Sequence, residues 1–374
     1  MPSETPLSTS IQSLKSTLSP ELPTLITLAT FGLPISAREM ASTCFDEGNV
    51  LAAVTQLGLG GLALSLDEQF RGGQCHIYKL SFLDEADSEA RKSLAVRVPL
   101  YMPDGDGMIS ALRTEWQTLL KLQEKGFVWS PEPLGCSLTF DNPVKHPFLV
   151  LRWIEGSHAC WNDTFPARPL RDKFLMQLAG IQTCLIECTL RVGPATWQEF
   201  FERIIENKRS RVLDGKLPGL SEQDCDDQKA LLSHVLSINS QEGPDKKSFA
   251  IDHGDLKPEN IIVDQDYNIK CIIDWGFADS VPLPRAAGLP RFLWGSSLSP
   301  TAQKDKHSYL AAVSSQHSPQ GSLQLFQTEG NVEFRTLYLE SLFSKGMHML
   351  LAKNRWQIPG HSHIGDHDPG EFGN

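Results

Sequence analysis

The spacing of apolar residues changes near residue 155, and this change limits the folds that the chain can adopt. Before it, short stretches alternate as strands do: in residues 93–99, Leu94, Val96 and Val98 share one face, while Ala95 and Arg97 share the other. After it, apolar side chains recur at helical spacing in residues 170–190, 196–213, 228–237 and 333–353. The sequence therefore predicts two unlike lobes, one built on a sheet and one built mainly of helices.

The boundaries of these lobes follow from the same patterns. We expect a β-rich lobe over residues 61–155, with strands at 62–66, 75–82, 93–99 and 147–154 and an amphipathic helix at 108–125. A mainly helical lobe is expected over residues 156–354, interrupted by two short strands at 260–263 and 269–273. Residues 1–60 are expected to form a mobile and then helical extension, and residues 355–374 a mobile tail. The predicted fold class is α+β.

Charge and hydropathy exclude some classes of function. The 34 basic and 45 acidic residues give a net charge of −11, which argues against nucleic acid as a partner. The two longest charge-free runs, residues 22–37 and 49–66, contain prolines or glycines and do not resemble membrane spans. The first residues show no signal-peptide pattern, so a cytoplasmic location is the expectation.

One motif in the second lobe indicates a particular chemistry. Residues 253–260 read His-Gly-Asp-Leu-Lys-Pro-Glu-Asn, and Asp274 follows Asp255 by nineteen residues at the start of Asp-Trp-Gly. Phosphoryl transfer needs a carboxylate to orient the attacking hydroxyl and oxygen ligands to hold Mg²⁺ against the nucleotide phosphates. Asp255 and Asn260 bracket a tight loop, and the turn between the two short strands brings Asn260 toward Asp274. We expect Asp255 to be the catalytic base, with Asn260 and Asp274 as metal ligands.

This motif resembles the catalytic loop and the metal-binding aspartate of the protein-kinase-like superfamily. The His-Gly-Asp sequence, and Ile-Asp-Trp around Asp274, look more like the aminoglycoside phosphotransferase and choline kinase branch. Residues 278–292 are similar to fungal-type members of that branch, and the resemblance covers roughly residues 70–294. It implies a protein-kinase-like two-lobe fold and a phosphotransferase that uses ATP and Mg²⁺.

The resemblance also implies phosphate-binding residues in the first lobe. Gly72 and Gly73 look like the loop that covers the phosphates, although a plain hairpin turn explains them equally well. Ala95 and Arg97 are similar to the Ala-x-Lys of the third strand, and Glu115 would pair with Arg97. Arginine keeps a permanent charge and binds phosphate with two donors, but it is bulkier than the lysine of the family. A solvated strand edge and a solvated helix face are the alternatives for Arg97 and Glu115.

The resemblance further implies a hinge between the lobes. Backbone groups of the hinge would meet the edge of the adenine, and a simple core strand is the alternative. The hinge residues are Leu151, Arg152, Trp153 and Ile154.

Two other functions compete with a small-molecule kinase. A protein Ser/Thr kinase would explain Asp-Leu-Lys-Pro-Glu-Asn with Lys257, but no Ala-Pro-Glu follows Asp274, and Pro282 and Pro284 interrupt the segment where a peptide would dock. A pseudokinase, which binds nucleotide without turnover, would explain Arg97 and the glycine-poor loop. The presence of Asp255, Asn260 and Asp274 together argues against it.

The acceptor is expected to be a small molecule with a hydroxyl group. Residues 221–228 carry four acids and no base, and an acidic rim would favour an acceptor with a positive charge. A solvated acidic loop is the alternative reading of this segment.

Overall fold

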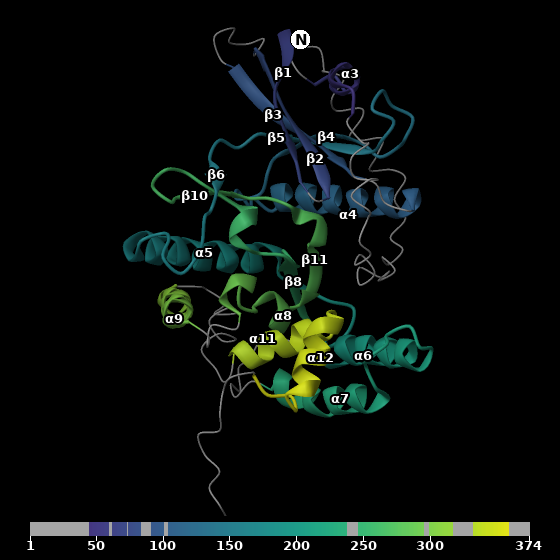
Figure 1. Ribbon diagram of the computed structural model, residues 1–374, viewed down its shortest axis with the longest axis vertical. Helices are drawn as coiled ribbons and strands as arrows, with labels where there is room; N and C mark the ends of the chain where they lie inside the picture. The colour runs from purple at the N-terminus through teal and green to yellow at the C-terminus, as the bar shows by residue number, and fades with distance from the viewer. Residues whose placement is uncertain are drawn as a thin grey trace, which may run out of the picture. The chain divides into compact units, whose positions relative to one another are not determined.

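The computed structural model describes residues 45–59, 62–72, 74–83, 91–100, 104–237, 246–294, 299–316 and 332–358. The chain divides into two compact units, Met1–Ile35 and Ser36–Asn374, and every described residue belongs to the second unit. That unit consists of a sheet-based lobe, which ends at Arg152, and a mainly helical lobe that follows it (Figure 1). The expected α+β class is therefore confirmed.

A five-stranded antiparallel sheet forms the first lobe, in the order β1-β2-β3-β5-β4. Its strands are β1 (Leu62–Arg71), β2 (Cys75–Leu83), β3 (Arg91–Pro99), β4 (Pro133–Ser137) and β5 (Phe148–Arg152). In the register, Ile77 lies opposite Phe70 and Arg97, and Ala95 lies opposite Lys79 and Leu151. Side chains alternate between the two faces of a strand, so Ile77, Arg97 and Ala95 share one face.

The other face of this sheet is closed by helix α3 (Glu47–Gln56). Val50, Ala53 and Val54 of α3 form a buried cluster with apolar side chains of β2, β3 and β5. Asp46 caps the helix, because its side chain accepts a hydrogen bond of 3.0 Å from the backbone N–H of Asn49. Helix α4 (Gly105–Glu124) buries Glu115 along with its apolar side chains. A buried carboxylate needs a partner, so this face of α4 has a role besides apolar packing.

The second lobe contains helices and two small sheets. Its helices are α5 (Arg168–Thr189), α6 (Trp197–Leu213), α7 (Glu222–Leu236), α8 (Leu283–Ala286), α9 (Pro300–Ser315), α11 (Val332–Ser341) and α12 (Lys345–Lys353). One sheet has the order β10-β9-β6, from Ile269–Ile272, Ile261–Val263 and Ser157–His158. The other has the order β11-β8-β7, from Asp279–Pro282, Ser248–Asp252 and Arg191–Val192. Within the described part of the chain, no helix is both long enough and apolar enough to cross a bilayer.

Helix boundaries differ from expectation at two places. The expected helix 333–353 is wrong, because the structure has two helices there. Ser344 begins α12 by accepting a hydrogen bond from the backbone N–H of Met347 at 3.2 Å. Helix α7 begins at Glu222 rather than at residue 228, since Ser221 and Asp224 form a capping box that starts the helix earlier.

A buried lysine joins four helices of the second lobe. Lys208 of α6 is 8 % exposed and donates to the carbonyl of Ser341, to Gln228 Oε1 at 3.3 Å and to His348 Nδ1 at 3.1 Å. Burial lowers the pKa of Lys208 from 10.5 to about 7, and burial likewise lowers the pKa of His348 to about 4. The folded protein therefore gives up the Lys208 proton at a lower pH than the unfolded chain does.

This difference predicts that stability depends on pH. Between pH 7 and 10.5 the unfolded chain binds more protons at Lys208 than the folded one, so the free energy of unfolding rises with pH. In Lys208→Met this contribution disappears, and the slope falls by up to about 1.4 kcal/mol per pH unit. Urea unfolding of both proteins at several pH values above 7 measures the difference. Parallel pH profiles would show that Lys208 keeps an ordinary pKa.

Candidate active site

The loop after β8 places Asp255 by a glycine turn and a buried histidine. Gly254 has a φ of +78°, and a Cβ atom there would lie 2.3 Å from the carbonyl oxygen of Phe277, so only glycine fits. His253 Nδ1 accepts from the backbone N–H of Asp255 at 3.3 Å, which leaves Nε2 to donate to the carbonyl of Ile273 at 3.0 Å. Burial lowers the pKa of His253, in keeping with a neutral ring that orients the loop.

The Asp255 carboxylate is buried and held by three side chains. Oδ2 lies 2.6 Å from Lys257 Nζ and 3.3 Å from Asn260 Nδ2, and Oδ1 accepts from Arg291 Nη1 at 3.0 Å. The Asp255 side chain is 9 % exposed, against 39 % for Lys257 and 56 % for Arg291. The two cations therefore stand between the carboxylate and solvent.

Asn260 precedes and Asp274 follows the hairpin formed by β9 and β10, so both lie at its open end. The backbone N–H of Ile273 donates to the carbonyl of Asn260 at 2.8 Å, which fixes the open end of the hairpin. Asn260 Nδ2 donates to the carbonyl of Asp255 at 2.9 Å, so the amide presents Oδ1 as its remaining polar atom. Asp274 adopts a left-handed conformation with φ and ψ of 63°, and its side chain is 31 % exposed. This donor set of carboxylate and amide oxygens fits Mg²⁺.

Arg97 connects the first lobe to Asp274. Its guanidinium bonds to Glu115 Oε2 through Nη1 and to Asp274 Oδ1 through Nη2, the latter at 2.8 Å. The Glu115 side chain is 3 % exposed and that of Arg97 is 13 % exposed. Burial alone would lower the pKa of Arg97, but the charge of Glu115, together with Cys75 and Asp274, raises it above its ordinary value. The sequence-predicted partners thus meet, and Arg97 also engages one expected metal ligand.

The coupling of Arg97 and Glu115 can be measured. Breaking a buried ion pair from one side costs about 3–5 kcal/mol when the other charge stays buried without a partner, as Glu115 would in Arg97→Ala. In Glu115→Ala, Arg97 keeps its contact with Asp274. We therefore expect Arg97→Ala and Glu115→Ala each to lower stability and nucleotide affinity, and the double variant to lose much less than their sum. A double-mutant cycle in both quantities measures this term. Additive losses would mean that the pair contributes nothing, and Arg97→Lys should keep part of the affinity.

The other residues predicted to bind nucleotide lie on the sheet face that carries Arg97 or at the ends of strands. Gly72 lies in the turn between β1 and β2, where its N–H donates to the carbonyl of Cys75 at 2.9 Å; Gly73 lies outside the described residues. Ala95 pairs with Leu151 across β3 and β5.

The hinge has fewer unpaired backbone N–H groups than the resemblance implies. The N–H groups of Arg152 and Trp153 already donate to the carbonyls of Glu132 at 2.9 Å and Ser93 at 3.2 Å. These two donors are therefore not available to a base.

The hinge residue Trp153 forms an aromatic pair with Phe70, which the sequence does not indicate. The rings of Phe70 and Trp153 stack at a centroid distance of 5.7 Å and an angle of 18°, and Lys79 Nζ lies 4.8 Å from the Trp153 ring centroid. Trp153 Nε1 is buried and has no hydrogen-bond partner among the described residues. An acceptor atom of a bound base would satisfy this N–H.

We expect Trp153→Leu to weaken nucleotide binding about five- to tenfold, because an aromatic stacking contact and one hydrogen bond are lost. Calorimetric titration with ATP measures the change. Phe140→Leu serves as the control, since Phe140 is an exposed aromatic residue of the same lobe that packs against His146 instead. Equal affinities of the Trp153 variant and the wild type would place the base elsewhere.

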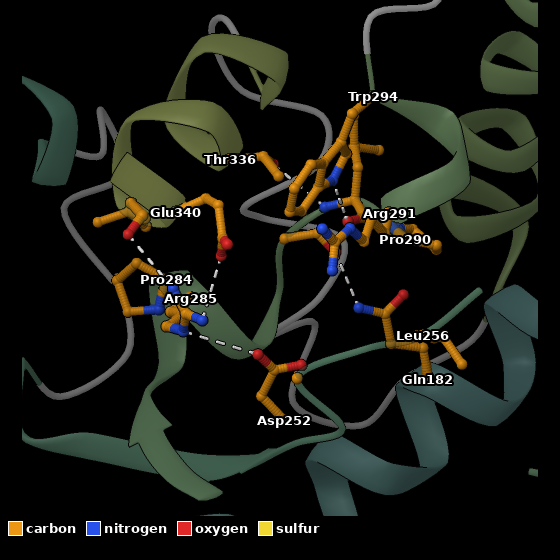
Figure 2. Close-up of a pocket in the computed structure, with 14 residues that line it drawn as sticks. Gln182, Asp252, Leu256, Pro284, Arg285, Pro290, Arg291, Trp294, Thr336 and Glu340 are labelled. Atoms are coloured by element: carbon orange, nitrogen blue, oxygen red, sulfur yellow. Dashed lines mark hydrogen bonds and ion pairs between the residues drawn. The ribbon is translucent and has the colours of Figure 1, made fainter. Parts of the chain in front are cut away.

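A pocket opens next to Asp255 in the second lobe (Figure 2). Gly254 and Leu256, the neighbours of Asp255 in the chain, both line it, as does Arg291. The other lining residues come from α5, β8, the segment 284–294 and α11: Gln182, Asp252, Pro284, Arg285, Gly288, Leu289, Pro290, Trp294, Thr336, Leu339 and Glu340. A ligand in this pocket would adjoin the loop that carries Asp255.

The acidic segment 221–228 does not contribute to this pocket. Asp224 closes the capping box of α7, Glu222 and Asp226 pair with Arg209, and Asp227 accepts from Gln223 at 2.8 Å. All four acids thus have roles within α6 and α7, so the segment gives no support to a cationic acceptor at this site.

Comparison with known proteins agrees with this architecture. Residues 109–283 match the family described as "Phosphotransferase enzyme family". No curated protein matches the sequence. Among solved structures, the gentamicin complex of APH(2")-IIa shares 12 % identity at a TM-score of 0.50, covering 84 % of this chain and 97 % of its own. The fold is thus the protein-kinase-like two-lobe fold that the sequence predicts.

Two further solved structures, both aminoglycoside phosphotransferases, match less closely. APH(3'')-Id from Streptomyces rimosus shares 15 % identity at a TM-score of 0.46, covering 80 % of this chain and 100 % of its own. The enzyme from Alicyclobacillus acidocaldarius shares 13 % identity at a TM-score of 0.42, covering 84 % and 94 %.

Proposed function

We propose that this protein is an ATP-dependent phosphotransferase that moves the γ-phosphoryl group to a hydroxyl of a small molecule. One observation carries the proposal: Asp255, with Lys257 and Arg291 on its carboxylate, adjoins a pocket and contacts Asn260, and the hairpin of β9 and β10 brings Asp274 toward Asn260. The match of residues 109–283 to a phosphotransferase family supports it. The similarity of residues 278–292 to fungal-type members of that branch, and the cytoplasmic location, remain predictions.

Each of these residues has its own role in the proposed transfer. Asp255 accepts or orients the proton of the attacking hydroxyl, as a positioned general base does. Asn260 and Asp274 would hold Mg²⁺, which neutralises charge on the phosphates when it is bound. Arg97, fixed by Glu115, binds the phosphates, and Gly72 and Gly73 cover them. Lys257 and Arg291 stabilise the charge that develops on the phosphoryl group.

A pseudokinase is the second candidate, and one contact favours it. Arg97 Nη2 occupies Asp274 Oδ1, an atom that the metal would need. A protein kinase is the weaker alternative, because no Ala-Pro-Glu follows Asp274 and the segment 284–294 lines the pocket instead.

A combined binding and turnover assay tests the proposal. Ligands that bind the folded state raise the melting temperature, so ATP with Mg²⁺ should stabilise the protein and a true acceptor should add to that effect. Phosphorylation of an alcohol, amino alcohol or sugar from a panel confirms the proposal. Stabilisation by nucleotide without any ADP formation would favour the pseudokinase, and phosphorylation of peptides alone would favour the protein kinase.

A further inference from the structure

The pocket beside Asp255 carries no net charge in its walls (Figure 2). Its lining contains two acids, Asp252 and Glu340, and two arginines, Arg285 and Arg291, so the formal charges sum to zero. A ligand with several ammonium groups binds where carboxylates are in excess. These four side chains do not provide that excess.

Arg285 is held firmly between the two acids. Its Nε lies 3.7 Å from Asp252 Oδ2, and its Nη2 lies 3.3 Å from Glu340 Oε2. Nη1 donates to the carbonyl of Leu339 at 3.3 Å, and the guanidinium lies 3.9 Å from the ring centroid of Phe343. The Arg285 side chain is only 15 % exposed, and Figure 2 shows it directed toward both carboxylates. The protein thus supplies its own cation to this acid pair.

The environment of the two acids shows how much this cation matters. Burial and the charge of Asp252 raise the pKa of Glu340, and Arg285 counteracts the rise. Without Arg285, two half-buried carboxylates would face each other, and a ligand ammonium would be the natural counter-charge.

We propose that Arg285 is a specificity-determining residue that takes the place of a ligand ammonium and restricts the acceptor to uncharged hydroxyl compounds. The inference rests on the proposed function, because the pocket receives the acceptor only if Asp255 serves the transfer. Trp294, Leu289 and Pro290 offer apolar contacts to the carbon skeleton of such a compound. This acceptor class differs from the cationic one predicted from the acidic segment 221–228.

The test compares charge variants of the pocket by calorimetry, with 2-deoxystreptamine, a cyclitol bearing two ammonium groups, as the probe. Arg285→Gln should bind it at least about tenfold more tightly than the wild type, and the gain should fade with salt. Arg285→Lys keeps the charge and should bind it as weakly as the wild type. Equal binding by wild type and Arg285→Gln, whether tight or undetectable, would overturn the proposal.

A second variant keeps the test independent of whether Arg285→Gln folds. Glu340→Gln replaces an acid by its neutral isostere and leaves the pocket with one excess positive charge. It should gain about tenfold in affinity for quinate, a cyclitol carboxylate, and unchanged quinate binding would also overturn the proposal. Both readouts are binding and not turnover. A protein without ATP-dependent transfer would therefore disprove the proposed function and leave the result on Arg285 readable.

Discussion

Asp255→Asn is expected to remove most of the phosphoryl transfer while the protein stays folded. Positioned acid–base groups contribute about 10²–10⁴-fold to rates, and asparagine cannot accept the proton of the hydroxyl. The substitution leaves Lys257 and Arg291 without their carboxylate partner, but both are more than one-third exposed and remain solvated. The melting temperature and the affinity for nucleotide should therefore stay close to the wild-type values.

Steady-state rates with the best acceptor, together with calorimetric ATP binding, check this expectation. Asp214→Asn is a suitable control, because Asp214 is a half-exposed surface acid that pairs with Lys216. A variant at Asp255 that kept near-normal turnover would assign the base to another residue.

Asp274→Asn is expected to abolish the Mg²⁺-dependent part of nucleotide binding. Asparagine is preferred to alanine here, because Asp274 has a φ of +63° and asparagine tolerates this left-handed conformation better. The variant loses the charge of the proposed main oxygen ligand. Disturbing even an outer-shell partner typically costs about 10–100-fold in metal affinity, so we expect a larger loss for the ligand itself.

Titration of ATP with and without Mg²⁺ separates the two contributions to binding. In the absence of metal the variant and the wild type should differ little, and with metal only the wild type should gain affinity. If the two Mg²⁺ titrations coincide, the metal is held elsewhere.

Local sequence patterns predict the parts of the site that are close in the chain. Strand β3 follows from strict alternation, and the catalytic loop follows from the short spacing between Asp255 and Asn260. The hairpin that brings Asp274 to Asn260 is also local, since Asp274 follows Asn260 by only fourteen residues. In these places the covalent chain itself restricts the geometry.

Contacts between distant segments escape the same reasoning. Arg291 reaches Asp255 from thirty-six residues away, and Arg285 meets Glu340 across fifty-five. Strand β7 has only two residues, Arg191 and Val192, so no periodicity can reveal it; its partner β8 defines it. Such features depend on how helices and sheets pack, which the spacing of residues along one segment does not encode.

The bridge from Glu115 through Arg97 to Asp274 has a consequence for how the molecule denatures. One guanidinium belongs at once to the sheet of the first lobe, to α4 and to the loop after β10. Loss of the first lobe's structure would leave Asp274 without its cation, and loss of the second lobe's structure would leave Arg97 with only one of its two carboxylates. We therefore expect this contact to favour one cooperative transition, in which a single melting step would not reveal the boundary between the lobes.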